Sequence, residues 1–191
     1  DAVSVQQLTE QQAYDFLRSR RSVRLFKPQI PTDEDVLKLL NICRYAPTAG
    51  NSQGMYFTVI SNQELIQKIC RATIDWMEKE VELGTENKRY FRAVLATYHE
   101  KKVDIIGRNA PIFVSARRLN VTGISNSEQC LAYAEVFAPA IGLGTTMAGF
   151  IQACAIAEYK PLVDLVGTPS KQKLVGCMMV GYPRVKYQRM P

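Results

Sequence analysis

The chain has 191 residues, 47% of them hydrophobic and 22% charged, and a formal net charge of +6, which is typical of one globular domain with its own core. Its five separated cysteines and single histidine argue against a disulfide framework, a zinc site and a Ser-His-Asp triad. We therefore expect a single domain over residues 1–191, without a metal site, in the reducing cytoplasm, where cysteines remain unpaired.

The N-terminal part of the chain predicts three helices and one strand. A sparse apolar pattern indicates a helix over Gln6–Arg18. A second helix begins after Thr32, a suitable N-cap followed by three acidic residues, and ends before Pro47. The β-branched and aromatic run Met55–Ile60 predicts a buried strand, and Glu64–Ala72 predicts another helix.

The middle of the chain predicts peripheral helices followed by a second strand and a central helix. Residues 75–107 are rich in charged helix formers and indicate one or two helices lying over the domain, outside its centre. Pro111–Ala116 predicts a core strand. Ser125 and Glu128 have capping-box spacing and would open a helix that continues to Ile141.

The last third predicts a turn, a helix and a strand. Gly142-Leu143-Gly144 ends the preceding helix, a further helix covers Thr146–Glu158, and Leu174–Val180 forms the last buried strand. Since helices outnumber strands and hairpin signals are missing, the predicted class is α+β with a small central sheet.

Two classes of partner are disfavoured by the sequence. The apolar stretch Leu131–Ile151 is interrupted by Glu135, Pro139 and three glycines, so it indicates a buried helix and a turn, with no membrane span. Basic residues gather within 18–27 and 184–189. Nucleic-acid binding would favour a basic stripe interleaved with aromatic residues, and no such stripe joins these two regions. Composition alone leaves a small phosphorylated ligand and a polymer equally open.

Three segments carry residues suited to ligand binding. Arg20, Ser22 and Arg24 share one face of an extended stretch and could bind a phosphate, although a solvated basic loop is the simpler interpretation. The connection 46–53 offers backbone N–H groups and amides. Residues 142–149 follow a helix and place Met147 where a third glycine belongs, which excludes a dinucleotide fingerprint.

The order of these segments resembles that of the nitroreductase family of FMN enzymes across almost the whole chain. In that family an Arg-Arg-Ser-x-Arg segment holds the flavin phosphate, and an Ala-Pro-Ser-x-x-Asn-x-Gln loop reaches the flavin from the second subunit. Here Thr48 replaces the Ser of the loop, and Gly54-Met55 replaces a common Pro-Trp. The resemblance assigns cofactor binding to Arg20, Arg21, Ser22, Arg24, Pro47, Thr48, Ala49, Asn51, Gln53, Thr146, Met147, Ala148, Gly149, Lys186 and Arg189.

The resemblance also implies the fold, the partners and the activity. It implies a nitroreductase-like fold with a mostly antiparallel sheet, in an intertwined homodimer with two flavins at the interface. FMN would carry the chemistry without a catalytic side chain, while Arg24 stabilises the reduced ring near N1 and O2 and the Ala148 N–H faces N5. Reduced nicotinamide or a ferredoxin-type donor would supply electrons to a nitroaromatic, quinone or similar small aromatic acceptor, with ping-pong kinetics.

Three alternatives remain open at this point. The protein could bind or sequester flavin without turnover, it could be a basic nucleic-acid-binding module, or it could belong to a dehalogenating or flavin-cleaving branch of the same family. The subgroup with the most similar C-terminal sequence often carries a ferredoxin module upstream, which would lie before Asp1.

Overall fold

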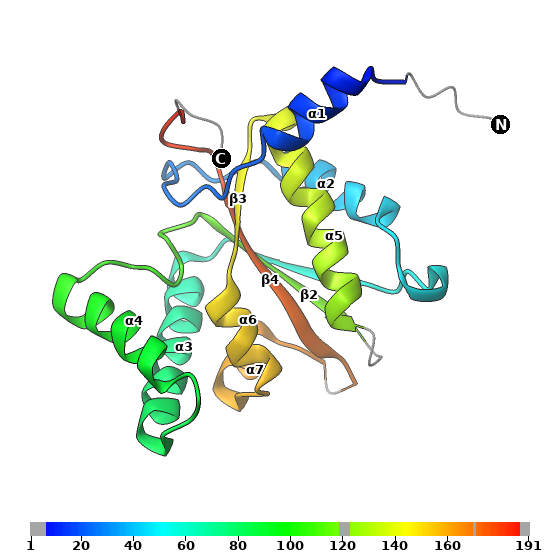
Figure 1. Ribbon diagram of the computed structural model, residues 1–191. Helices are drawn as coiled ribbons and strands as arrows, with labels where there is room; N and C mark the ends of the chain where they lie inside the picture. The colour runs from blue at the N-terminus through cyan, green and yellow to red at the C-terminus, as the bar shows by residue number, and fades with distance from the viewer. Residues whose placement is uncertain (1–6, 119–122, 170, 188–191) are drawn as a thin grey trace.

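A four-stranded antiparallel sheet lies at the centre of the computed structural model, which describes residues 7–118, 123–169 and 171–187. The strand order is β1-β2-β4-β3, and each neighbouring pair is antiparallel (Figure 1). The predicted α+β class with a small antiparallel sheet is therefore confirmed. The strands are β1 (Tyr56–Ile60), β2 (Ile112–Arg118), β3 (Gly144–Met147) and β4 (Lys173–Gly181).

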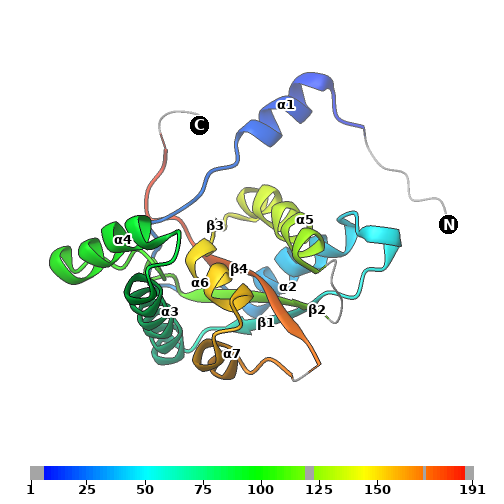
Figure 2. The ribbon, with the colours of Figure 1, turned by 60° about the horizontal axis from the view of Figure 1, so that its bottom comes forward.

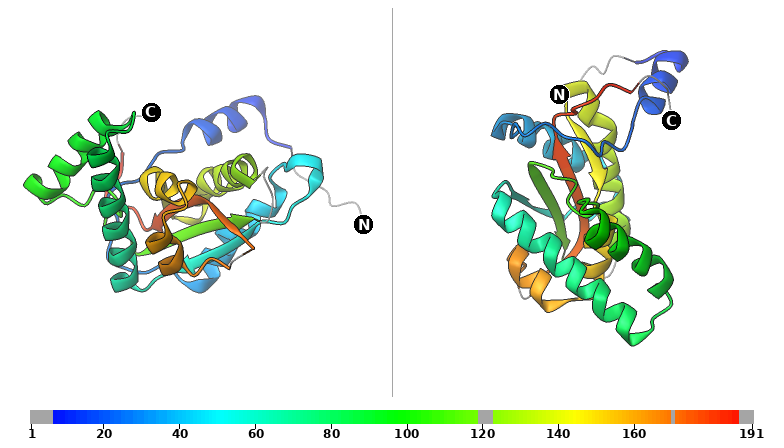
Figure 3. Two further views of the ribbon diagram at one scale, coloured as in Figure 1. Left: turned by 90° about the horizontal axis from the view of Figure 1, so that it is seen from below. Right: turned by 90° about the vertical axis from the view of Figure 1, so that its left-hand side faces the viewer.

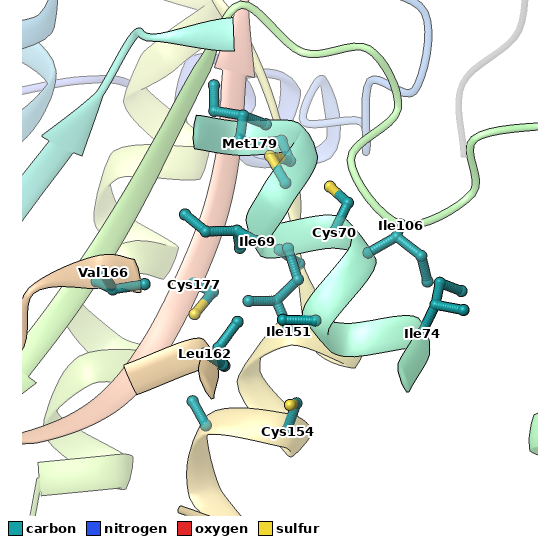
Figure 4. Packing of buried hydrophobic residues seen from close by; sticks show 14 of the residues in the cluster. Ile69, Cys70, Ile74, Ile106, Ile151, Cys154, Leu162, Val166, Cys177 and Met179 are labelled. Carbon is teal, nitrogen blue, oxygen red and sulfur yellow. The ribbon is translucent and has the colours of Figure 1, made fainter. Parts of the chain in front are cut away.

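Helices cover both faces of this sheet, and β4 divides the core between them. Alternate side chains of a strand point to opposite faces, so Cys177 and Met179 join one apolar cluster while Met178 and Val180 join the other. The first cluster packs α3 (Gln63–Leu83), α6 (Gly149–Ile156) and α7 (Lys160–Val166) (Figure 4). Helix α4 (Lys88–Lys101) adds Phe91 and Val94 to it. The second packs α2 (Asp33–Asn41) and α5 (Gly123–Phe137).

Helix α5 docks closely on β4 because a glycine faces it. A Cβ on Gly176 would come within 2.8 Å of the Ser127 hydroxyl oxygen and 2.9 Å of a Leu131 methyl carbon. The same hydroxyl donates to the carbonyl of Val175 at 3.0 Å, so the helix and the strand are joined by a buried hydrogen bond.

Two segments near the ends of the described chain pair with each other, and the first of them also pairs with β3. The N–H of Val23 donates to the Thr145 carbonyl at 2.7 Å, and the N–H of Lys27 donates to the Tyr182 carbonyl at 2.8 Å. The N–H of Arg184 donates to the Leu25 carbonyl at 2.9 Å. We call residues 20–27 the N-terminal arm and residues 182–187 the C-terminal arm. Helix α1 (Glu10–Arg18), which precedes the N-terminal arm, stands away from the body (Figure 2).

Several predicted elements are confirmed, among them the N-cap of α2. The Thr32 side chain accepts a hydrogen bond from the Asp35 N–H at 3.2 Å, as its position predicted. Strands β1, β2 and β4 lie where the sequence indicated, although in β1 only Ile60 is buried, because this strand forms an edge of the sheet. Helix α1 begins at Glu10, four residues after the predicted start, because Thr9 forms its capping box.

Other predictions were wrong in their boundaries or type. Helix α3 continues past Ala72 to Leu83 and buries Ile74 and Met77, so part of the segment expected to be peripheral lies in the core. Helix α5 begins at Gly123, which places Ser125 inside the helix. It ends at Phe137, and the 3-10 turn η3 (Ala138–Ile141) follows.

The predicted helix Thr146–Glu158 was wrong at its start, and α7 was not predicted. Thr146 and Met147 belong to β3, which pairs with β4, and the helix begins only at Gly149. Helix α7 has a proline in its first turn, a position where the missing N–H of proline costs nothing.

Candidate functional site

The N-terminal arm is extended, so successive side chains point in opposite directions. Arg20 Nη1 donates to the Ser22 hydroxyl at 3.4 Å, which places both side chains on one face as the spacing predicted. The guanidinium carbon of Arg21 lies 4.4 Å from the ring centroid of Tyr187, in the C-terminal arm. The arm therefore presents cationic groups in two directions.

Glu135 of α5 lies beside Arg20, a contact that no local sequence pattern predicts. Its Oε1 is 3.4 Å from Arg20 Nη1, and its side chain is 11% exposed. Burial raises the pKa of the Glu135 carboxyl, while Arg20 and Arg24 act in the opposite direction. A largely buried acid thus holds the first arginine of the arm in place.

A cavity of about 480 Å³, here called cavity 1, opens where the arm, β3 and α6 meet. Arg24 lines it from the arm, and Tyr90 and Phe150 form part of an aromatic wall with ring centroids 5.8 Å apart. The predicted residues Thr146, Met147, Ala148 and Gly149 also line this cavity. The structure therefore brings together Arg24 and the segment that follows the Gly-Leu-Gly turn. Helices α3, α4 and α6 lie around this side of the sheet (Figure 3, left).

The backbone at the start of α6 requires one correction. The Ala148 N–H, expected to face the flavin N5, donates to the Cys177 carbonyl at 2.9 Å and is used within the fold. Gly149 is the first residue of α6, where N–H groups have no acceptor within the helix. A Cβ built on Gly149 meets nothing within 4 Å, so this glycine faces open space in cavity 1.

A second guanidinium, that of Arg108, also lines cavity 1. Its loop lies between α4 and β2, and Asp104 fixes it by accepting hydrogen bonds from the backbone N–H groups of Ile106, Gly107 and Asn109. Arg108 was not among the predicted site residues, because no local motif distinguishes it from the other basic residues of this part of the chain.

A second cavity, of about 600 Å³, lies on the other side of the N-terminal arm. We call it cavity 2. Arg21 and Lys186 line it, so the two basic regions of the sequence lie together as far as residue 187. Thr145 lines it too, and its buried hydroxyl has no hydrogen-bond partner in the described structure. Arg189 lies outside the described residues.

The loop with Pro47, Thr48, Ala49, Asn51 and Gln53 lies far from cavity 1 of its own chain, at the end of the sheet away from α4 (Figures 1 and 3). It is anchored at its base, because the Ala49 N–H donates to the buried Asn126 side chain at 3.0 Å. Its left-handed residues include Asn51 and Gln53, and the Gln53 N–H donates to the Thr48 hydroxyl at 2.9 Å. The structure does not bring these five residues to the arginines of the same chain.

Other kinds of site find little support in the described residues. Across residues 7–118, 123–169 and 171–187, no helix is long and apolar enough to cross a membrane. The same ranges contain no cluster of His, Cys, Asp and Glu that could hold a metal ion. All five cysteines are buried, and burial raises the pKa of Cys43, Cys70 and Cys154 to about 12, so these thiols are poor nucleophiles.

Comparison with known proteins identifies the family. Residues 17–182 match the model of the Nitroreductase family. The chain is 24% identical to an iodotyrosine deiodinase of Thermotoga neapolitana over 184 residues, 92% of each protein. A shorter match, 37% identical over 54 residues, covers 28% of this chain and 31% of an Archaeoglobus fulgidus relative named for NAD(P)H nitroreductase activity.

The fold is also found among solved structures. A nitroreductase with bound FMN from Bacteroides fragilis superposes with a TM-score of 0.75 at 16% identity, and 96% of each chain is covered. Since the family model covers most of the sequence, the chain belongs to the nitroreductase family.

Proposed function

We propose that the protein is an FMN-dependent oxidoreductase that holds the flavin ring in cavity 1 and reduces small organic acceptors there. The observation that carries this proposal is the convergence of Arg24 with the Met147–Gly149 turn on one cavity. The related Bacteroides fragilis nitroreductase has FMN bound, which supports the choice of cofactor.

The residues present fit an FMN molecule in shape and charge. Gly149 leaves the space that a planar ring needs beside the first turn of α6. Arg20 and Ser22, whose side chains are within 3.4 Å of each other, supply charge-assisted donors for a phosphate. Arg21 and Lys186 add positive charge on the neighbouring side, and we propose that Arg189 adds to it.

FMN supplies the hydride and electron transfer when it is bound, so the chain needs no acid or base of its own. Arg24 places a positive charge in cavity 1, where it stabilises negative charge that develops during reduction. Gly149, in place of the engaged Ala148, offers the backbone N–H for the flavin N5. Glu135 holds Arg20 within the arm through their 3.4 Å ion pair.

The donor and the acceptor would use this same cavity in turn. With a nitroaromatic acceptor, NAD(P)H, one proton and Ar–NO₂ become NAD(P)⁺, Ar–NO and water, in two half-reactions that use one site in turn. A ferredoxin-type donor would supply the two electrons singly.

The homodimer belongs to this proposal, because the loop 47–53 lies too far from cavity 1 of its own chain and would complete that of the partner.

Steady-state kinetics with FMN-loaded protein test the proposal. Parallel double-reciprocal plots for oxidation of NADH or NADPH against a quinone or nitroaromatic would support the ping-pong scheme. Protein that retains FMN but oxidises neither nicotinamide in the presence of any acceptor, and accepts no electrons from reduced ferredoxin, would be a flavin-sequestering protein instead.

Reductive dehalogenation is a second candidate function, favoured by one observation. The match to the Thermotoga neapolitana iodotyrosine deiodinase extends over 92% of the chain. Release of iodide from iodotyrosine by the reduced, FMN-loaded protein, measured with an iodide electrode, would support this branch. Reduction of nitroaromatics without iodide release would favour the first candidate.

A further inference from the structure

Cavity 1 is lined by a second arginine, Arg108, that the proposed FMN contacts do not use. Arg24 and Arg108 both line it, and none of its described lining residues is acidic. Within the described part of the chain, neither arginine forms an ion pair within 4.0 Å. Two guanidinium groups thus share a cavity whose described lining holds no acidic residue, and the carboxylates that attract them, Asp104 for Arg108 and Glu135 for Arg24, lie outside that lining.

The loop that carries Arg108 is held firmly in this position. Both carboxylate oxygens of Asp104 are occupied by backbone N–H groups, at 3.1 Å from Ile106, 2.8 Å from Gly107 and 2.8 Å from Asn109. Gly107 lets the loop lie against α3, because a Cβ there would come within 2.6 Å of the Cys70 sulfur. Arg108 therefore reaches the cavity from a fixed backbone.

The electrostatics of this arrangement favour an anion in the cavity. Burial lowers the pKa of Arg108, and the positive charge of Arg24 lowers it further, while Asp104 and Tyr90 act in the opposite direction. An anionic group placed beside Arg108 would offset the two effects that lower the pKa. Since Arg24 is assigned to the flavin ring, Arg108 is left to bind a group on the other reactant.

The walls of the cavity indicate what carries this anion. The Tyr90 ring lies 5.8 Å from that of Phe150 and 6.3 Å from that of Phe91, so aromatic surface faces the cavity beside Arg108. Asn87 also lines this cavity. A flat aromatic body would pack on these rings, and a carboxylate matches the two parallel donors of a guanidinium.

We propose that the preferred acceptors are aromatic carboxylates and that Arg108 is the residue that selects them. This inference rests on the proposed function, since it names the substrate class of the same cavity. It assigns the acidic group of the acceptor to Arg108 and leaves Arg24 to the flavin.

The test compares an acidic acceptor with its neutral ester, each measured on the wild type and on the variants. FMN-loaded protein is reduced anaerobically with one equivalent of dithionite and mixed in a stopped-flow instrument with 4-nitrobenzoate or its neutral methyl ester. The variants are Arg108→Gln, Arg108→Lys and Arg92→Gln, the last being an exposed arginine of α4 outside cavity 1. Dithionite removes the nicotinamide from the measurement, so an effect on donor binding does not enter.

We expect Arg108→Gln to lower the second-order rate constant for 4-nitrobenzoate by about 10- to 100-fold, as the loss of one charge-assisted contact implies. The rate with the ester should stay unchanged, Arg108→Lys should restore part of the loss, and Arg92→Gln should match the wild type. Benzoate, which cannot be reduced, provides a readout without turnover. Calorimetry should show it binding to the oxidised wild type and more weakly to Arg108→Gln.

Several results would overturn the inference. If Arg108→Gln lowers the rate constants for the acid and the ester equally, Arg108 acts through the flavin or the fold. If it lowers neither rate constant, Arg108 does not select the acceptor. If Arg108→Gln does not fold, a wild type that binds no benzoate and reduces both acceptors equally fast still refutes the substrate class. A wild type that takes up no FMN, or reduces no acceptor at all, contradicts the proposed function itself.

Discussion

Replacing Gly149 with alanine separates the binding of FMN from the stability of the fold. A Cβ at this position meets nothing within 4 Å, so the new methyl group enters cavity 1 without a clash in the free protein. Alanine in a helix is more stable than glycine by about 0.5–1 kcal/mol, so the free variant should be as stable as the wild type or more so. If the flavin ring packs on Gly149, the new methyl group would overlap with it at a cost of about 1–3 kcal/mol. This cost would weaken FMN binding by roughly 5- to 150-fold.

Two titrations measure the two effects of Gly149→Ala. Quenching of flavin fluorescence gives the dissociation constant of FMN, and urea unfolding without FMN gives the free energy of unfolding. Gly144→Ala is the matched control, because its Cβ would lie 2.6 Å from a Val23 methyl in one arm and 3.0 Å from Pro183 Cγ in the other. That variant should lose about 1–3 kcal/mol of stability. If Gly149→Ala binds FMN as tightly as the wild type, the ring does not lie in cavity 1.

Three further predictions concern charge and thiols. Arg20→Ala should weaken FMN binding by about 1.5–3 kcal/mol, measured by the same fluorescence titration, and an unchanged affinity would remove Arg20 from the phosphate site. Because burial raises the pKa of Glu135 above the ordinary 4.5, the native protein binds more protons than the unfolded chain as the pH rises from 4.5 to the raised value. The free energy of unfolding should therefore fall across that interval, and urea titrations of Glu135→Gln at several pH values should show a smaller fall; an identical profile would refute this assignment. A thiol reagent should leave the native protein unmodified and react with five cysteines after unfolding, whereas fast modification of the native protein would contradict their burial.

Local signals predicted much of the framework correctly. The Thr32 cap depends only on residues three positions apart, and β4 depends on an unbroken apolar run, so neither needed knowledge of distant contacts. The shared face of Arg20 and Ser22 follows from the geometry of an extended backbone. The segments of the candidate site were found because their order resembles a known family.

Features that depend on tertiary contacts could not be predicted in the same way. Thr146 was assigned to a helix, although it pairs with Met179 of β4, because the pairing partner lies far along the chain. Glu135 acquires its role from Arg20, which is distant in sequence, and Arg108 reaches cavity 1 only because Asp104 fixes its loop. None of these positions carries a local pattern that distinguishes it from an ordinary strand, helix or surface residue.

A crystal structure of the FMN complex would decide where the flavin binds. We expect the flavin ring in cavity 1 against Gly149 and Arg24, with the phosphate beside Arg20 and Ser22 and the two arms still paired with each other beside β3. Flavin bound elsewhere, with cavity 1 filled by side chains or the arms apart from each other, would contradict this expectation.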